Sequence, residues 1–278
     1  MADIKIIAFD LDGTLLNTQK ELTPTTREAL ASAAAKGIEI VPATGRIWDV
    51  IPECVRNLDF IHYAVTLNGA KIFDVKSSKV IAKFEIPPER ALKMARVFDD
   101  IDGTIYDVVL NDKGYIRRDF YEVVPDFMYD IWQTRIVLDH RKPVDNFYEI
   151  IENSGGVQKF QIYTLDKELR LNLLKALPVV FPKSEFASSL PNNVEINDKT
   201  SNKGNGLKAL TDYLNLKLEN ILAFGDGSND VSMIKAAGVG VAMKNSYPEL
   251  LEVADFVTDD CDHDGVAKGI QKQLGMRS

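Results

Sequence analysis

Residues 4–9, IKIIAF, are apolar on both faces of an extended chain and rich in β-branched side chains, and the run ends on Asp10. Such a run is typical of a central strand in a parallel sheet, which is covered on both faces. Helix and strand then alternate, with a helix expected over 24–36, a strand over 38–42, a helix over 48–58 and a strand over 63–66. This alternation predicts an α/β fold with a doubly wound parallel sheet.

The alternation stops after Asn68-Gly69 and returns at Lys203. The stretches AKIFDV and KVIAKFEI flank Lys76-Ser77-Ser78 and predict an antiparallel hairpin. Helices expected over 89–100, 144–153 and 166–177 then mix with short strands in GTIYDVVL, VQKFQIYT and NNVEIN, which is an α+β pattern. The sequence therefore predicts a Rossmann-like core of residues 1–84 and 198–278, interrupted by an inserted α+β cap domain of residues 85–197.

Composition excludes several classes of protein. The net charge of -8 argues against a general nucleic-acid binder, which needs a basic face toward the phosphate backbone. No apolar run approaches the roughly 18 residues of a membrane span, and MADIKIIAFD lacks the basic start of a signal peptide. Cys54 and Cys261 lie far apart in a chain that can fold without disulfides, which favours free thiols. We expect a cytoplasmic monomer or small homo-oligomer that binds neither nucleic acid nor membrane.

Four polar clusters stand where strands are expected to end. They are Asp10-Leu11-Asp12-Gly13-Thr14, Thr44-Gly45-Arg46, Lys203, and Gly225-Asp226-Gly227-Ser228-Asn229-Asp230. Ligands of doubly wound sheets bind just beyond the carboxyl ends of the strands, so we expect these clusters to share one site. Together they supply carboxylates, a hydroxyl with backbone donors, and a cation, which are the groups that phosphoryl transfer requires.

Asp10 and Asp12 are two residues apart in a segment that leaves a strand, so their side chains can point the same way. One carboxylate can attack phosphorus and form an acyl phosphate. The other can protonate the leaving alkoxide and later deprotonate water. Crowded carboxylates need a compensating cation, so Asp10 and Asp226, with Asp230 as a further candidate, predict a site for a hard divalent ion such as Mg²⁺.

At these residues the chain resembles the haloacid dehalogenase superfamily, and within it the Cof-like phosphatases with a type IIB cap. The matching segments are DLDGTLL (10–16), ATGR (43–46), LNGA (67–70), Lys203-Gly204, GDGSNDVSMIKAAGVGVAM (225–243) and, more weakly, ADFVTDDCDHDGVAKGI (254–270). They cover the expected core from end to end in a specific order, whereas the cap matches only in its length and its α+β pattern.

The resemblance implies a role for each matching residue. Asp10 would be the nucleophile and a metal ligand, and Asp12 the general acid/base that also binds metal through its backbone carbonyl. Lys203 would balance charge on the phosphoryl group and the nucleophile. The remaining implied roles are phosphate contacts at Leu11, Thr44, Gly45 and Asn229, and metal binding at Asp226 and, directly or through water, at Asp230.

Several polar residues have two competing interpretations. Asn68 is a candidate contact for phosphate or leaving group, or else a turn asparagine. Arg46 is a candidate contact for an anionic substrate, with a structural ion pair as the favoured alternative. Arg117, Arg118 and Lys159 are candidate cations at a cap entrance, and a solvated face is the favoured interpretation of each.

The residues Asp260, Asp262 and Asp264 followed by Gly265 reproduce the first half of an EF-hand calcium loop. The twelfth position of such a loop would be Gln271 rather than glutamate, which removes the bidentate ligand. We interpret the segment as an acidic turn that caps the last helix.

The leading functional hypothesis is a Mg²⁺-dependent phosphatase of small phosphorylated metabolites, sugar phosphates foremost. A phosphomutase of the phosphomannomutase type is the alternative within the same chemistry, and would return the phosphate to its substrate. A non-catalytic sensor of phosphorylated metabolites is the alternative outside it. The set Asp10, Asp12, Lys203 and Asp226 argues against the sensor, because binding alone does not require a leaving-group acid.

Overall fold

The computed structural model describes residues 3–275. The chain forms two compact units: the first unit comprises the residues up to Lys83 and from Asn202 onward, and the second unit comprises Phe84–Ser201. The first unit contains a five-stranded and a three-stranded sheet, the second unit contains a six-stranded sheet, and each unit has its own apolar core. No helix among residues 3–275 combines the length and the apolar character needed to cross a membrane.

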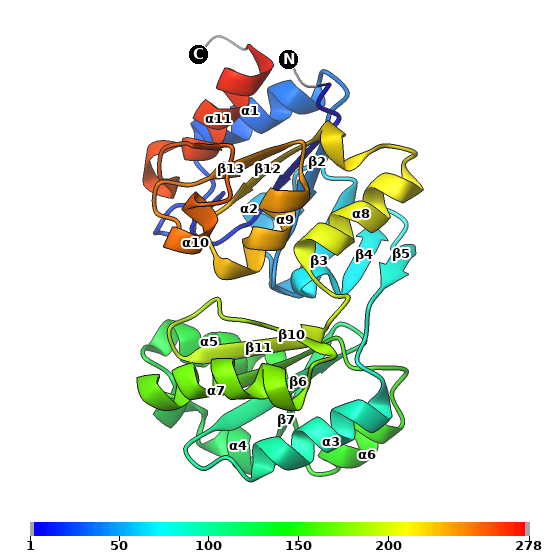
Figure 1. The fold of residues 1–278 in the computed structure, drawn as a ribbon, viewed down its shortest axis with the longest axis vertical. Coiled ribbons are helices and arrows are strands. Elements are labelled where there is room, and N and C mark those ends of the chain that lie inside the picture. Colours follow the sequence, from blue (N-terminus) through cyan, green and yellow to red (C-terminus); the bar gives the residue numbers. More distant parts are fainter. Residues whose placement is uncertain (1–2, 276–278) are drawn as a thin grey trace. The chain divides into compact units, whose positions relative to one another are not determined.

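The first unit is built on a parallel sheet with the strand order β14-β13-β12-β1-β2 (Figure 1). Its strands are β1 (Ile6–Phe9), β2 (Glu39–Pro42), β12 (Ile221–Gly225), β13 (Val239–Ala242) and β14 (Phe256–Val257). The central strand β1 pairs with β12 on one side and with β2 on the other, and all its residues are buried. The predicted doubly wound parallel sheet is confirmed.

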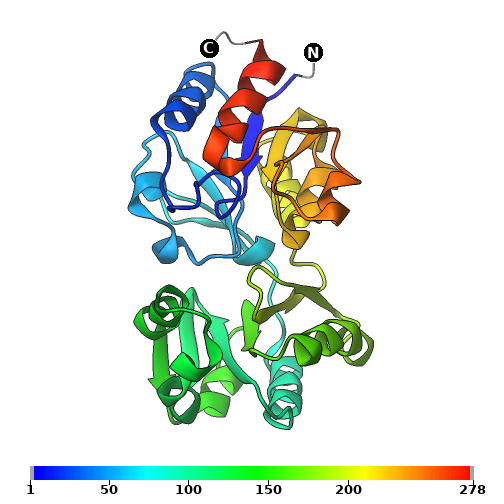
Figure 2. The same cartoon turned by 90° about the vertical axis from the view of Figure 1, so that its left-hand side faces the viewer.

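Helices cover both faces of this sheet, with α1 and α11 side by side on one face and α8 and α9 on the other (Figures 1 and 2). Ile7 and Phe9 of β1 share a buried cluster with α1 and α11, whereas Ile6 and Ala8 point to the opposite face. The helices of the unit are α1 (Pro24–Ala34), α2 (Glu53–Arg56), α8 (Lys203–Tyr213), α9 (Val231–Ala236), α10 (Pro248–Leu251) and α11 (Gly265–Leu274).

The start of α1 follows the sequence prediction, but the prediction of a helix over 48–58 was wrong. Thr23 is the N-cap of α1 and its side chain accepts a hydrogen bond from the N–H of Thr26, with Pro24 at the first helical position. Residues 48–58 instead form a 3₁₀ turn, Trp48–Val50, and the single turn of α2. Pro52 separates them, because a proline disfavours helical backbone at the residue before it.

A three-stranded antiparallel sheet adjoins β2. It has the order β3-β4-β5, with β3 (Tyr63–Thr66), β4 (Lys71–Asp74) and β5 (Val80–Lys83). The predicted hairpin corresponds to β4 and β5. A bridge between Ala43 and Val65 links β3 to the chain that leaves β2, so the segment after β3 reaches the same sheet edge as Asp10.

The second unit is an α+β structure built on a six-stranded sheet with the order β10-β11-β9-β6-β7-β8, in which only β7 and β8 pair in parallel. Its strands are β6 (Ile105–Leu110), β7 (Lys113–Arg117), β8 (Arg141–Val144), β9 (Lys159–Tyr163), β10 (Ser184–Ala187) and β11 (Asn193–Asp198). Its helices are α3 (Pro88–Asp99), α4 (Arg118–Glu122), α5 (Ile131–His140), α6 (Phe147–Glu152) and α7 (Lys167–Val180). One core cluster joins α3, α6 and α7 to one sheet face (Figure 1).

Candidate active site

The carboxyl ends of three neighbouring strands bring the predicted polar clusters together. Asp10 directly follows β1, Asp226 directly follows β12, and Thr44 lies two residues after β2. The N–H of Asp10 donates to the carbonyl of Phe224 at 3.0 Å, and the N–H of Ala43 donates to that of Phe9 at 2.8 Å. The sheet pairing therefore continues into the site at Asp10 and at Ala43, the residue before Thr44.

Lys203 is fully buried between two carboxylates. Its Nζ donates to Oδ1 of Asp10 at 2.6 Å and to Oδ1 of Asp230 at 2.5 Å. Burial alone would lower the pKa of Lys203, but Asp10 and Asp230 raise it above its ordinary value, so the lysine is a cation. The expectation that Lys203 stands at a strand end was wrong: it is the first residue of α8, which begins there because Asn202 caps the helix.

Three acidic residues could hold a metal ion. Oxygens of Asp10, Asp226 and Asp230 lie within 4.8 Å of one another. Thr14 donates from Oγ1 to Oδ1 of Asp226 at 2.6 Å, which orients that carboxylate. Gly13 has a φ of 81°, and a Cβ at this position would lie 2.3 Å from Oδ2 of Asp226, so glycine is required for the close approach. Carboxylate oxygens in this arrangement fit a hard divalent cation such as Mg²⁺.

Asp230 differs from the other two because both its oxygens already accept hydrogen bonds. Oδ1 accepts from Lys203, and Oδ2 accepts from the N–H groups of Asp226 and Gly227 at 3.0 and 2.9 Å. The residue is fully buried. These contacts orient Lys203 and the 226–227 turn, and they leave Asp10 and Asp226 as the stronger candidates for binding a metal ion.

Two carboxylates of the cluster have pKa values well above the ordinary value of 3.8. Burial raises the pKa of Asp10 to about 7; Lys203 opposes this shift, and the charges of Asp230 and Asp12 add to it. Burial, with the charges of Asp10 and Asp230, raises the pKa of Asp226 to about 8. Because these carboxylates interact, the protons belong to the group as a whole. A divalent cation would replace these protons, so the residues fit the expected metal.

We expect Mg²⁺ to stabilise the protein more as the pH rises. Without metal, the stability contributed by the protonated Asp10 and Asp226 is fully present below their ordinary pKa of 3.8 and is lost as the pH rises through about 7 to 8. Mg²⁺ affinity should rise by up to about tenfold per pH unit for each proton displaced. Thermal unfolding with excess Mg²⁺ or with EDTA, at pH about 5.5 and about 8.5 and matched ionic strength, measures the effect. An equal increase in Tm at both pH values would contradict it.

The carboxylate of Asp12 pairs with two cations. Arg46 donates from Nε to Oδ2 and from Nη2 to Oδ1, both at 2.8 Å, and Lys20 Nζ contacts Oδ1 at 2.8 Å. Burial alone would raise the pKa of Asp12, but Arg46 and Lys20 lower it below its ordinary value. The favoured interpretation of Arg46 as an ion pair thus describes this structure, and its partner is the predicted acid/base.

Sequence reasoning missed Lys20, which lies in the turn between the first motif and α1. The turn is closed by hydrogen bonds from the N–H of Asn17 to the carbonyl of Glu21 at 3.0 Å and from the N–H of Lys20 to the carbonyl of Asn17 at 2.9 Å. Lys20 has a φ of 65°, a left-handed conformation that is uncommon for lysine. No motif marks the residue, because its position beside Asp12 depends on the turn.

The predicted phosphate-binding residues line the same sheet edge. Thr44 is buried, its N–H donates to the carbonyl of Val65 at 2.9 Å, and its Oγ1 accepts from the N–H of Arg46 at 3.2 Å. Leu11 and Gly45 follow Asp10 and Thr44 in the chain, so their backbone lies at this edge as well. Asn229 donates from Nδ2 to Oδ1 of Asn68 at 3.0 Å.

The family model for haloacid dehalogenase-like hydrolases matches residues 7–270 of this chain. The chain belongs to the haloacid dehalogenase-like hydrolases. The hydrolase is 31% identical over 269 residues to 5-amino-6-(5-phospho-D-ribitylamino)uracil phosphatase YcsE of Bacillus subtilis (strain 168), covering 97% of this chain and 95% of that protein. It is 27% identical over 279 residues to pyridoxal phosphate phosphatase YbhA of Escherichia coli (strain K12), covering 97% and 98% of the two chains.

A solved structure agrees with these relatives. The HAD subclass IIB sugar phosphatase BT4131 matches the hydrolase with a TM-score of 0.81 at 27% identity, over 98% of this chain and 100% of that chain. The resemblance to the haloacid dehalogenase superfamily and its Cof-like phosphatases is therefore confirmed, and the protein is a phosphatase.

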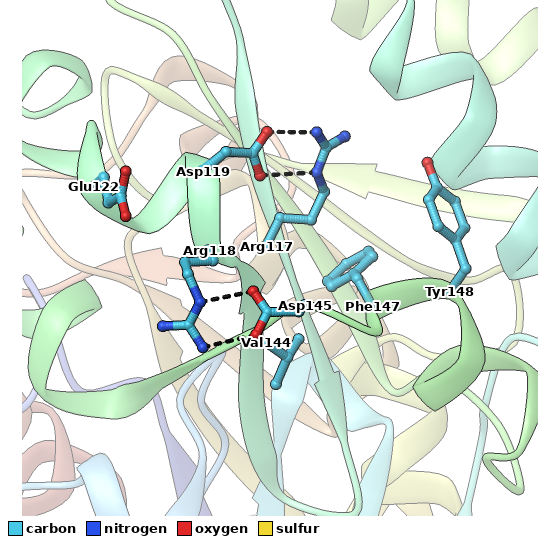
Figure 3. A pocket seen from close by; sticks show the side chains of 8 residues that line it. All are labelled: Arg117, Arg118, Asp119, Glu122, Val144, Asp145, Phe147 and Tyr148. Carbon is cyan, nitrogen blue, oxygen red and sulfur yellow. Dashed lines mark hydrogen bonds and ion pairs between the residues drawn. The ribbon is translucent and has the colours of Figure 1, made fainter.

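The candidate cap cations of the hydrolase all lie in the second unit and all have acidic partners. Arg117 pairs with Asp99 and Asp119, and Arg118 pairs with Asp145. Both arginines line an open pocket of about 560 Å³. There the guanidinium group of Arg117 faces the carboxylate of Asp119, and that of Arg118 faces the carboxylate of Asp145 (Figure 3).

The third candidate, Lys159, contradicts the expectation of a solvated face. It is 4% exposed and its Nζ lies 3.0 Å from Oε1 of Glu195. Lys159 lies on β9 and Glu195 on the neighbouring strand β11, and their pairing allows both charges to be buried.

The side chains of the acidic turn before α11 bond to the start of α1 and to the loop before it, and the side chain expected to cap α11 does not do so. Asp264 is the N-cap residue of α11, but its side chain makes no capping bond and instead accepts from Thr23 at 2.5 Å and Thr26 at 3.2 Å. Asp262 accepts from the N–H and Oγ1 of Thr18. These bonds tie the start of α1 to the turn before α11, and thereby hold the loop that carries Lys20.

Proposed function

We propose that this phosphatase hydrolyses phosphate monoesters of small polar metabolites, sugar phosphates foremost, through an aspartyl-phosphate on Asp10 and with Mg²⁺ as cofactor. The observation that carries the proposal is the position of Lys203 Nζ, 2.6 Å from Asp10 Oδ1 within a cluster of three carboxylates. A buried cation beside the nucleophile stabilises the negative charge that a phosphoryl group brings.

Asp10 starts the reaction. One of its oxygens attacks phosphorus, the bond between phosphorus and the leaving oxygen breaks, and protonated Asp12 gives its proton to that oxygen. Ionised Asp12 then takes a proton from water, the water oxygen attacks phosphorus, and the bond to Asp10 breaks to release phosphate. Arg46 and Lys20 pair with the carboxylate form of Asp12, which is the form between the two proton transfers.

The other residues bind and orient. Lys203, Thr44, Asn229 and the backbone N–H groups of Leu11 and Gly45 would donate to the phosphoryl oxygens. Asp10, Asp226 and the backbone carbonyl of Asp12 would hold Mg²⁺, with Asp230 behind them. When bound, Mg²⁺ supplies positive charge that neutralises the phosphoryl oxygens.

The proposed substrate class rests on the relatives. One is named for a phosphorylated ribityl compound, another for pyridoxal phosphate and a third as a sugar phosphatase. Each of these names refers to a small polar compound that carries a phosphate. We propose that Phe84–Ser201 is the cap that sets the choice among such substrates.

The direct test is release of inorganic phosphate from para-nitrophenyl phosphate and a panel of sugar phosphates, in Mg²⁺ and in EDTA. We expect release only with Mg²⁺. Isomerised sugar phosphate without free phosphate would favour the mutase, and binding of sugar phosphate without either product would favour the sensor.

Replacing Asp12 with alanine should affect poor leaving groups most. General acid catalysis contributes about 10²–10⁴-fold, so we expect a loss of this size for a sugar phosphate. The loss for para-nitrophenyl phosphate should be much smaller, because nitrophenolate leaves without a proton. Asp59→Ala, at an exposed aspartate of the same unit, is the matched control. Equal losses on both substrates would exclude the acid role.

A further inference from the structure

Three consecutive residues after β3 adopt left-handed backbone. Leu67, Asn68 and Gly69 have φ angles of 54°, 57° and 92°. Glycine accepts this region freely and asparagine tolerates it, but leucine does not favour it. All three are buried, so no solvent contact explains the conformation. Unfavourable backbone persists only where the surrounding contacts determine it, and such places cluster at functional sites.

The segment 67–69 contacts the loop that carries Thr44. The N–H of Leu67 donates to the carbonyl of Arg46 at 3.1 Å, and the N–H of Asn68 donates to the carbonyl of Thr44 at 3.0 Å. In the opposite direction the N–H of Thr44 donates to the carbonyl of Val65. The peptide groups on both sides of Thr44 are therefore fixed by β3 and by the chain that leaves it.

The same segment contacts the start of α8. A Cβ on Gly69 would lie 2.2 Å from the backbone oxygen of Asn202, the residue before Lys203. A Cβ on Gly206 would lie 3.2 Å from the Cα of Gly69. The absence of side chains at both glycines allows the segment 67–69 and the first turn of α8 to pack backbone against backbone.

The side chain of Asn68 contacts the third loop. Its Oδ1 accepts from Nδ2 of Asn229 at 3.0 Å, and Asn68 is 4% exposed. Asn229 lies in the 3₁₀ turn Ser228–Asp230, which also carries Asp230. Three residues thus meet the loops of Thr44, Lys203 and Asn229, which approach Asp10 from separate parts of the chain.

We infer that Asn68 is a positioning residue, whose amide holds Asn229 in the orientation that binds a phosphoryl oxygen. The left-handed backbone of 67–69 places this amide while its N–H groups hold Thr44. The inference rests on the proposed function and assigns Asn68 a role through Asn229 rather than a contact with the leaving group.

The test separates the amide from the backbone. Asn68→Gly removes the amide but permits the left-handed backbone, whereas Asn68→Ala removes the amide and adds backbone strain. We expect Asn68→Gly to keep the Tm near that of the unchanged protein, to lower kcat/KM by about tenfold and to weaken inorganic phosphate binding in Mg²⁺ by a similar factor. Asn68→Ala should show the same kinetic loss with a lower Tm.

Two further variants make the test decisive. Asn215, exposed and with a φ of 55°, offers the matched control Asn215→Gly, which should leave kcat/KM and phosphate binding unchanged. The double variant Asn68→Gly/Asn229→Ala should lose no more kcat/KM and phosphate affinity than Asn229→Ala alone, because both changes remove the same hydrogen bond.

Unchanged phosphate affinity in Asn68→Gly, or losses that multiply in the double variant, would overturn the inference. The proposed function fails separately, if the unchanged protein releases phosphate from none of the monoesters. Phosphate binding, measured by calorimetry, reports on Asn68 in either case.

Discussion

Replacing Asp10 with asparagine should lower kcat by at least about 10⁴-fold, because the amide cannot take the phosphoryl group and no covalent intermediate forms. Asp10 is buried at the end of the central strand and contacts Lys203 at 2.6 Å. Asparagine has the same shape and keeps an oxygen toward Lys203. Phosphate release from a sugar phosphate, together with mass spectrometry of the protein after rapid quenching, measures turnover and the aspartyl-phosphate.

A stability measurement separates this loss from unfolding. Burial raises the pKa of Asp10, so the ionised form of Asp10 that prevails above this pKa destabilises the metal-free protein relative to the protonated form. Removing the charge should therefore leave the metal-free Tm at pH about 8 equal to or above that of the unchanged protein. Residual turnover within about tenfold of the unchanged protein, with the Tm retained, would exclude Asp10 as the nucleophile.

Replacing Lys203 with methionine should have the largest effect on stability. The lysine is fully buried and pairs with Asp10 and Asp230, so its loss leaves two buried carboxylates without their cation. Breaking a buried ion pair from one side costs about 3–5 kcal/mol of unfolding free energy. Turnover should also fall by about 10²–10³-fold, since a donor to the phosphoryl group is lost. Urea unfolding in EDTA and the phosphate-release assay measure the two effects.

Lys208→Met is the matched control for this variant. Lys208 lies on the same helix, pairs with Asp212 and is exposed, and exposed pairs contribute little. We expect less than about 1 kcal/mol from this change and no loss of turnover. The destabilisation by Lys203→Met should shrink as the pH falls, because protonation of Asp10 removes the unpaired charge. A pH-independent loss would instead indicate that packing of the lysine stem dominates.

The central features of the fold were predictable because they are local in the sequence. The apolar run ending at Asp10, the Thr23-Pro24 helix start and the return of strand–helix alternation after Lys203 each depend on neighbouring residues. Parts of the second unit were not predicted. Helix α5 exposes Ile131 and Trp132, so its apolar residues do not mark one buried face, and β8 is an edge strand that contains Pro143.

By itself the sequence determined the chemical inventory, because residue types and their spacing specify which groups are available at strand ends. It predicted a carboxylate nucleophile, a second carboxylate and a lysine, and with them the phosphatase chemistry. Only the tertiary structure decided the pairings: Lys203 between Asp10 and Asp230, Lys20 and Arg46 on Asp12, and Lys159 buried on Glu195. Those pairings depend on which distant loops meet and on how much water they exclude. The periodicity of a sequence predicts neither of these.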